Sequence, residues 1–409
     1  LQDAAYSIRG FVRATVQLVM APLRLWPRGM RKSVATPSRR PGGFQPPHCP
    51  NPACDFHHPR GDWHFVRNGK KLHRGRLLRQ TYLCRHCGRS FSATTFATTY
   101  WLRHPQLLRP IATLVTEGAG LRQTARVLRT SHTTVMRHLA RLGRHCLLTH
   151  RRLIADRPIP EALVFDGFES FAHSQFFPFH ANLAAGSTSW FIYHFTLSPL
   201  RRKGAMTRGQ KRKRARLEQL HGRPNPKAVE EGIAALLRPL LPYLASSART
   251  LHSDDHPAYP RALKRLKQQQ AMPACQHMAT SSKARRTQKN PLFPVNLADL
   301  LLRHGSANHR RETIAFSKCL QGVADRMAVF TVWRNYVKKR REKASWPTET
   351  AAMCAGVIDR ALSWREILKR RLFPAGADLP LEWMRYYYRR MEATGSGWKQ
   401  TEHCLRYAF

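Results

Sequence analysis

Negative charge is scarce in this chain. Its 409 residues include 24 Asp and Glu against 70 Lys and Arg, which gives a formal net charge of +46. A folded protein with so much self-repulsion calls for a polyanionic partner. We therefore expect the chain to bind nucleic acid. A ribosome-like protein or a protein bound to a membrane surface is the alternative.

Long hydrophobic runs are also missing. A membrane-spanning helix needs roughly 18 or more apolar residues in a row, and no stretch of the sequence reaches that length. The nearest approach, Phe11–Trp26, contains Arg13 and Arg24 and has no clean signal-peptide cleavage pattern. We expect no membrane partner. Residues 1–47 are interpreted as a basic tail and linker. Its first 29 residues are a candidate non-native extension, because the chain begins with Leu and Met30 is a possible start.

The cysteines do not form the regular framework of a secreted disulfide-rich protein. Four of the nine are paired in sequence, as Cys49 with Cys54 and Cys84 with Cys87. Two such turns supply the four thiolates of a tetrahedral zinc site. The stretch between the pairs has strand-like ends around a Gly and Lys middle, so residues 48–92 are predicted to be a zinc ribbon. Four unrelated buried thiols are the alternative.

Residues 100–150 show the periodicity of helices. Ser131 is a natural N-cap, and Val135, Leu139 and Leu142 mark the buried side of a helix after it. Two short helices joined by a three-residue turn predict a helix-turn-helix, with an ordinary helical hairpin as the alternative. The second helix would present to DNA the residues His132, Thr133, Thr134, Met136, Arg137 and Arg141.

Beyond residue 157 the pattern changes to that of an α/β domain. Strand-like runs occur at Ala162–Phe165 and Ser189–Leu197, and helical patterns occur at Lys227–Leu244 and Asp299–Lys343. Residues 201–216 form a very basic run. We interpret it as a segment that contacts the DNA backbone, and a disordered basic loop is the alternative. Residues 346–409 are expected to be a helical C-terminal segment. The sequence therefore predicts a multidomain α/β protein.

Two of the few carboxylates stand within or at the end of predicted strands. Asp166 follows the apolar run Ala162–Phe165, and Asp254 follows the short strand-like run Thr250–Ser253. Carboxylates at the ends of neighbouring strands can share two divalent metals, Mg²⁺ or Mn²⁺, that activate a water or a DNA 3′-hydroxyl. Taken singly, each Asp is better explained as a turn or N-cap residue, and only their joint spacing favours a metal site.

The order of these modules resembles bacterial insertion-sequence transposases that open with a zinc ribbon and a helix-turn-helix, of which insertion sequence one is the best-known relative. The resemblance covers residues 48–345 and rests on Tyr82–Phe91, Phe165–Phe171, Ser253–Tyr259 and Glu312–Lys318. It implies a ribonuclease-H-like DDE core over residues 158–345 and metal-dependent cleavage and strand transfer at inverted-repeat DNA ends. It also implies a homo-oligomer in the bacterial cytoplasm, associated with the nucleoid.

The third acid departs from the family pattern. In its place stands Asn296, which is a poor anchor for Mg²⁺. Asp299, one turn later, is our preferred third acid, and Glu312 is the other candidate if the helix breaks near Gly305. An incomplete triad would leave an inactive DNA-binding regulator. An RNA-binding protein is a weaker alternative, because exposed aromatics on a sheet are not evident.

Overall fold

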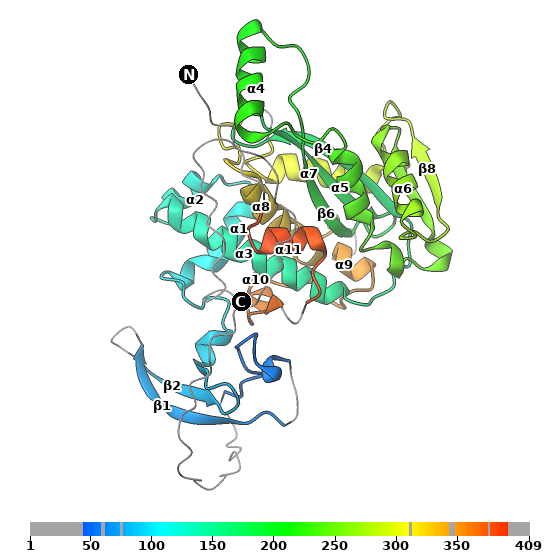
Figure 1. The fold of residues 1–409 in the computed structure, drawn as a ribbon. Coiled ribbons are helices and arrows are strands. Elements are labelled where there is room, and N and C mark those ends of the chain that lie inside the picture. The colour runs from blue at the N-terminus through cyan, green and yellow to red at the C-terminus, as the bar shows by residue number, and fades with distance from the viewer. Residues whose placement is uncertain are drawn as a thin grey trace, which may run out of the picture. The chain divides into compact units, whose positions relative to one another are not determined.

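The computed structural model describes residues 44–391, except 59–61, 74–76, 311–312, 343–347 and 375–376 (Figure 1). Most of the predicted tail, Glu312 and the end of the predicted C-terminal segment therefore lie outside the described residues. Within the described residues, no helix combines the length and apolar character needed to cross a membrane.

A small three-stranded sheet comes first. Its strands are β1 (Phe65–His73), β2 (Leu77–Cys84) and β3 (Ser90–Ser92), antiparallel in that order. The short 3-10 helices η1 (Asp55–His57) and η2 (Ala93–Phe96) flank it. Buried aromatic rings, among them Tyr82 and Phe91, fill the space beside the cysteines. This module has few aliphatic residues in its core, so aromatic packing and the cysteine cluster hold it together.

Three helices follow: α1 (Leu108–Thr116), α2 (Leu121–Val127) and α3 (His132–Ile154), with the 3-10 turn η3 (Pro105–Leu107) before them. The Ser131 side chain accepts a hydrogen bond from the Thr134 N–H, so it caps α3 as expected. Val135, Leu139 and Leu142 are buried, also as expected. The prediction of a short second helix was wrong. α3 has 23 residues because its C-terminal part is buried against α8 (Leu320–Val332).

A mixed five-stranded sheet forms the centre of the α/β part, which confirms the expected α/β class. Its order is β6-β5-β4-β7-β8. The strands are β4 (Leu163–Phe171), β5 (Pro178–Gly186), β6 (Ile192–Pro199), β7 (Thr250–Asp254) and β8 (Gln276–Thr280). β5 is antiparallel to both β4 and β6, and β7 is parallel to β4 and β8.

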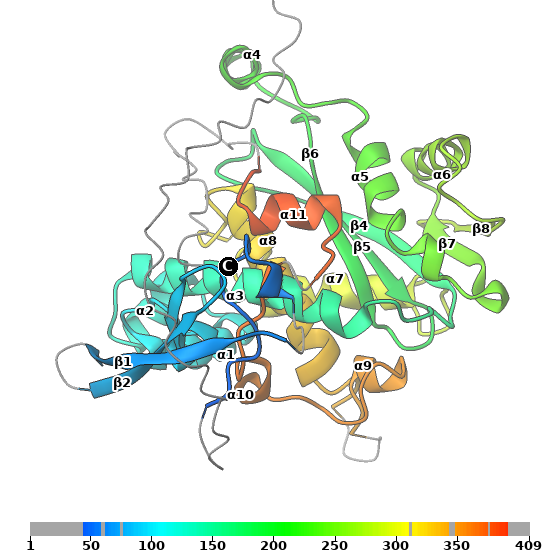
Figure 2. The same cartoon turned by 60° about the horizontal axis from the view of Figure 1, so that its bottom comes forward.

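Helices cover both faces of this sheet (Figures 1 and 2). α5 (Ala228–Leu237) and α6 (Ala258–Gln268) pack on one face, and α7 (Phe293–Gly305) and α8 on the other. α8 runs into the π-helical turn η6 (Trp333–Val337). The short 3-10 turns are η4 (Leu241–Tyr243) and η5 (Ser246–Ala248). The last helices are α9 (Ala351–Cys354), α10 (Trp364–Ile367) and α11 (Leu381–Tyr387).

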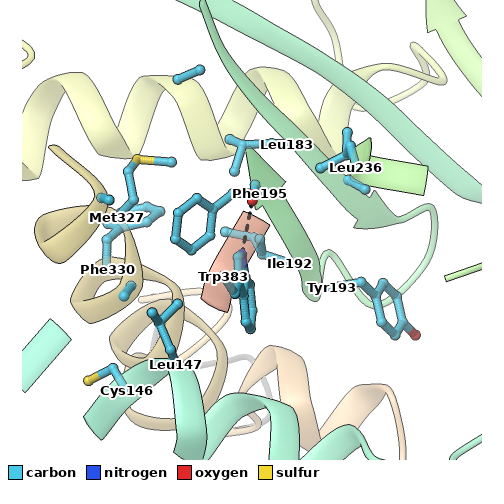
Figure 3. Close-up of a cluster of buried hydrophobic side chains, with 14 of the residues drawn as sticks. Cys146, Leu147, Leu183, Ile192, Tyr193, Phe195, Leu236, Met327, Phe330 and Trp383 are labelled. Atoms are coloured by element: carbon cyan, nitrogen blue, oxygen red, sulfur yellow. Dashed lines mark hydrogen bonds between the residues drawn. The ribbon is translucent and has the colours of Figure 1, made fainter. Parts of the chain in front are cut away.

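The C-terminal helix α11 is part of the main core. Trp383 is buried, and its indole N–H donates to the carbonyl oxygen of Phe195 at 3.0 Å (Figure 3). The backbone N–H of Leu197 donates a hydrogen bond to the Tyr386 hydroxyl oxygen at 2.9 Å. Side chains of α3, α8 and β6 surround the Trp383 ring (Figure 3). α11 therefore fixes the edge strand β6 to the helical layer.

Two further predictions need correction. One long helix was predicted over Asp299–Lys343, but the structure has two helices there. α7 begins before Asp299 and ends at Gly305, and α8 begins at Leu320. The strand β5 was missed, since its polar residues His180 and Asn182 interrupt an otherwise apolar run. Both residues are buried, and Asn182 donates to the hydroxyls of Thr196 and Ser198 on β6, so hydrogen bonds offset their burial.

Candidate functional site

The four paired cysteines come together in space. The Sγ atoms of Cys49, Cys54, Cys84 and Cys87 all lie within 4.8 Å of one another. The first two belong to the turn around η1, Cys84 ends β2, and Cys87 follows in the tight turn closed by Gly88. Gly88 has a φ of 69°, a left-handed conformation that suits glycine. The close spacing within each pair thus becomes one four-thiol cluster.

The distances between the sulfur atoms fit a tetrahedral metal. Cys49 Sγ lies 3.6 Å from Cys87 Sγ, and Cys54 Sγ lies 4.0 Å from Cys84 Sγ. A zinc–sulfur bond of about 2.3 Å gives a tetrahedron whose sulfurs are about 3.8 Å apart. The Trp63 indole N–H donates to Cys84 Sγ at 3.3 Å, an arrangement that stabilises a thiolate. This donor set and spacing suit zinc.

The exposed end of α3 carries five of the six predicted DNA-contacting residues. His132, Thr133 and Arg137 are exposed, and Thr134 and Met136 are partly exposed. The prediction for Arg141 fails on accessibility. Arg141 is only 9 % exposed, and its Nη2 donates to the Tyr100 carbonyl oxygen at 3.0 Å. At that depth α3 has already entered the core, so Arg141 does not share the exposed face.

Strand register places Asp166 beside Asp254. β4 and β7 are parallel, and Val164 is paired with His252. Asp166 and Asp254 each follow that pair by two residues, so both side chains emerge on the face of Val164. Neighbouring strands are about 4.8 Å apart. The two side chains therefore lie on the same face of adjacent strands, with Asp254 at the end of β7 and Asp166 within β4.

The helix α7 brings Asp299 to the same face. Val295 packs with Val164 and Ala185 in a small buried cluster, which fixes α7 on this side of the sheet. Asp299 lies four residues after Val295, hence one helical turn further along the same side of α7. Its Oδ1 is buried and has no hydrogen-bond partner within the described residues. A buried carboxylate oxygen without a donor is unfavourable unless a proton or a cation satisfies it.

The charges of these carboxylates influence one another. Burial raises the pKa of Asp166 to about 6, and the negative charge of Asp254 adds to the rise. Burial also raises the pKa of Asp299 well above its usual range, and the charge of Asp166 contributes. Like charges held together in this way are typical of sites that bind cations or exchange protons.

The carboxylates do not form a closed metal cage. Among the described residues, only the four cysteines place three or more ligand atoms of His, Cys, Asp or Glu within 4.8 Å of one another. An open arrangement is still chemically suited to Mg²⁺, which keeps several waters and takes few carboxylates from a protein. Glu312 lies outside the described residues, so the structure does not bear on its candidacy.

Three residues near the carboxylates were not predicted as site residues. The Tyr259 hydroxyl on α6 donates to Asp166 Oδ1 at 2.8 Å. The positive charges of Arg286 and Arg303 lower the pKa of Asp299, and Arg286 also acts on Asp166. Tyr259 lies within the family-like segment Ser253–Tyr259, which was its available signal. Arg303 follows Asp299 by four residues on α7, so helical spacing was its available signal, whereas Arg286 lies in the loop between β8 and α7 and had no local signal.

The basic run predicted at residues 201–216 contains a helix, α4 (Arg208–His221), and none of its residues is buried. α4 stands away from the sheet in both views (Figures 1 and 2). Arg208, Arg212 and Arg216 follow one another at successive turns and are exposed. The other side of the helix is anchored, because Glu218 accepts from Arg201 at 2.8 Å and lies 3.4 Å from Arg214. The arginine stripe Arg208–Arg212–Arg216 therefore faces away from the anchor.

No protein-family model matches this chain. Among solved structures, it is similar to the HTLV-2 integrase catalytic core domain in complex with magnesium, in its dimeric form, with a TM-score of 0.21 and 10% sequence identity. The match covers 49% of this chain and 97% of that chain.

Proposed function

We propose that this protein is a DDE-type transposase of an insertion sequence, which cuts and joins DNA with Mg²⁺ or Mn²⁺. Asp166 and Asp254 would hold the metal ions, with Asp299 as the third acid. The metals would supply an activated water or 3′-hydroxyl and stabilise the leaving oxygen. The observation that carries the proposal is the juxtaposition of Asp166 and Asp254 on paired parallel strands, with Asp299 on the helix that covers them.

The sheet topology supports this proposal. In chain order the strands are arranged third, second, first, fourth, fifth, and the second strand is antiparallel to the others. That is the arrangement of a ribonuclease-H-like core, the fold that the resemblance implies. Its first and fourth strands carry Asp166 and Asp254.

DNA binding would be divided among several elements. The four-cysteine module would hold a structural zinc ion, and the helix pair α2 and α3 would form the helix-turn-helix. The exposed residues of α3, His132, Thr133 and Arg137, would contact the element ends, with Thr134 and Met136 beside them. The arginine stripe on α4 would contact phosphates. We expect the active form to be a homo-oligomer on double-stranded DNA.

The decisive experiment is a joining assay with the full chain, DNA carrying the inverted repeats that flank its gene, and Mg²⁺ or Mn²⁺. Asp166→Ala is expected to abolish cleavage and strand transfer and to leave end binding intact. Asp255→Ala is the matched control, because Asp255 follows Asp254 but is exposed and accepts a hydrogen bond from the Ser282 N–H. Joining by the Asp166→Ala variant would disprove the assigned site.

A second candidate function is favoured by Asn296, which stands where the family has its third acid. On this reading the chain is a DNA-binding regulator descended from a transposase. It predicts end binding with no cleavage by the wild type under any divalent metal. The same joining assay separates the transposase from the regulator. Cleavage by the wild-type protein supports the transposase, and end binding without cleavage supports the regulator.

A further inference from the structure

Three buried arginines line a small cavity. None of them is close in sequence to Asp166, Asp254 or Asp299. Arg141 and Arg144 come from α3, and Arg371 comes from the segment after α10. Their exposed fractions are 9 %, 8 % and 5 %. The cavity has a volume of about 20 Å³. Arginine is rarely buried without a carboxylate partner, so this grouping needs a physical explanation.

No carboxylate lines this cavity. The negative charge of Asp325 acts on Arg144, but Oδ2 of Asp325 lies 3.2 Å from Nη1 of Arg389 and is already paired. The three guanidinium groups also repel one another, and burial lowers the pKa of each to about 10. The positive charge in this region therefore exceeds the negative charge that the described residues supply.

Several N–H groups around the cavity lack acceptors. The Nε of Arg144 is buried and has no acceptor among the described residues. Arg371 donates from Nη1 to the Thr95 carbonyl oxygen at 3.1 Å, and its Nη2 is buried with no acceptor. The rings of Tyr100 and Phe373, each about 5 Å from the Arg371 guanidinium carbon, stabilise its charge but accept no conventional hydrogen bond. Buried donors of this kind are costly when unsatisfied.

We propose that this cavity binds a small inorganic anion of halide size, coordinated by Arg144 and Arg371 with Arg141 beside them. Its volume suits one such ion, because about 10–15 Å³ accommodates a single water. The burial of the arginines keeps the phosphate of a DNA backbone out of reach. The anion supplies both the missing acceptor and the missing negative charge. This site does not depend on the proposed transposase activity.

The position of the site gives the anion a structural role. The segment that carries Arg371 connects α3 to the four-cysteine module. The Ile367 carbonyl oxygen accepts from His145 Nε2 at 2.7 Å, and the Leu368 carbonyl oxygen accepts from the Thr98 hydroxyl at 2.8 Å. Phe373 belongs to the buried cluster of the cysteine module. An anion between α3 and Arg371 would therefore strengthen the attachment of this segment.

Thermal unfolding of the full chain in sodium chloride and in sodium gluconate, at equal ionic strength and pH, tests the proposal. Equal ionic strength removes general screening from the comparison. We expect chloride and bromide to raise Tm in a saturable way, by about 2 °C at ten times the dissociation constant. A bound water would give the same Tm in both salts, and that result would overturn the proposal.

Arg144→Met is the site variant, and Arg137→Met is the control on the exposed part of the same helix. Arg144→Met is expected to lose the halide response while folding normally, because replacing a buried charge by an apolar side chain is often tolerated. Arg137→Met is expected to keep the response. A retained response in Arg144→Met would refute the assignment. Crystals grown in bromide provide a second measurement: anomalous density beside Arg144 and Arg371 supports the site, and its absence there contradicts it.

Discussion

The hydroxyl of Tyr259 donates a hydrogen bond of 2.8 Å to Oδ1 of Asp166, from a helix that begins just after the strand carrying Asp254. This bond connects α6 to the middle of β4. It lowers the pKa of Asp166 and so opposes the effect of burial. Tyr259 is buried, with 1 % of its surface exposed, so it holds the carboxylate in a fixed orientation. We assign it as a positioning residue.

Tyr259→Phe removes this hydrogen bond and keeps the ring. The pKa of Asp166 should rise further, so the acidic limb of the pH profile for DNA joining should move to higher pH. We also expect the free energy of unfolding to fall by about 1 kcal/mol. Tyr243→Phe is the control, since the Tyr243 hydroxyl bonds to Asp156 away from the carboxylates. An unchanged pH profile would remove Tyr259 from the site.

Asp166→Asn should stabilise the metal-free protein at neutral pH. The folded pKa of about 6 exceeds the ordinary 3.8, so the charged form is penalised above pH 6 and the penalty disappears below pH 4. Asparagine removes that penalty, with a gain of up to about 3 kcal/mol at pH 7.5. Thermal unfolding at both pH values measures it. Asp255→Asn should show no such gain, and an equal effect of Asp166→Asn at pH 4 would contradict the explanation.

Removal of zinc should unfold the four-cysteine module. We expect about one zinc ion per chain by elemental analysis. The double variant Cys84→Ser and Cys87→Ser should lose the metal and become sensitive to protease within residues 48–92. Cys275→Ser is the control, because Cys275 lies on the approach to β8 outside the cluster. Full metal content in the double variant would show that these thiols are not the ligands.

Neutralising the arginine stripe on α4 should weaken binding to duplex DNA regardless of its sequence. In the triple variant Arg208→Gln, Arg212→Gln and Arg216→Gln, the slope of log affinity against log salt should fall by about 2–3, since each phosphate contact contributes about 0.9. The control removes the same charge from exposed residues elsewhere, by Lys264→Gln, Lys267→Gln and Lys369→Gln. Equal slopes for the two triple variants would exclude α4 from the DNA interface.

Helix periodicity and spacing were enough to anticipate much of the local structure. The Ser131 cap and the burial of Val135 and Leu139 follow from short-range pattern, because a capping side chain and a buried stripe are properties of a single helix. The same pattern could not reveal that Arg141 is buried. Its neighbours in space, Tyr100 and Arg371, lie 41 and 230 residues away along the chain.

The strands that carry Asp166 and Asp254 could be located from the apolar runs before these residues, and the spacing of the cysteine pairs predicted their cluster. Only the tertiary structure decided that β4 pairs with β7, that α7 carries Asp299 to the same face, and that Tyr259 contacts Asp166. The reason is physical. Periodicity and spacing act within a few residues, whereas strand pairing and helix packing depend on contacts between segments that are distant in the chain.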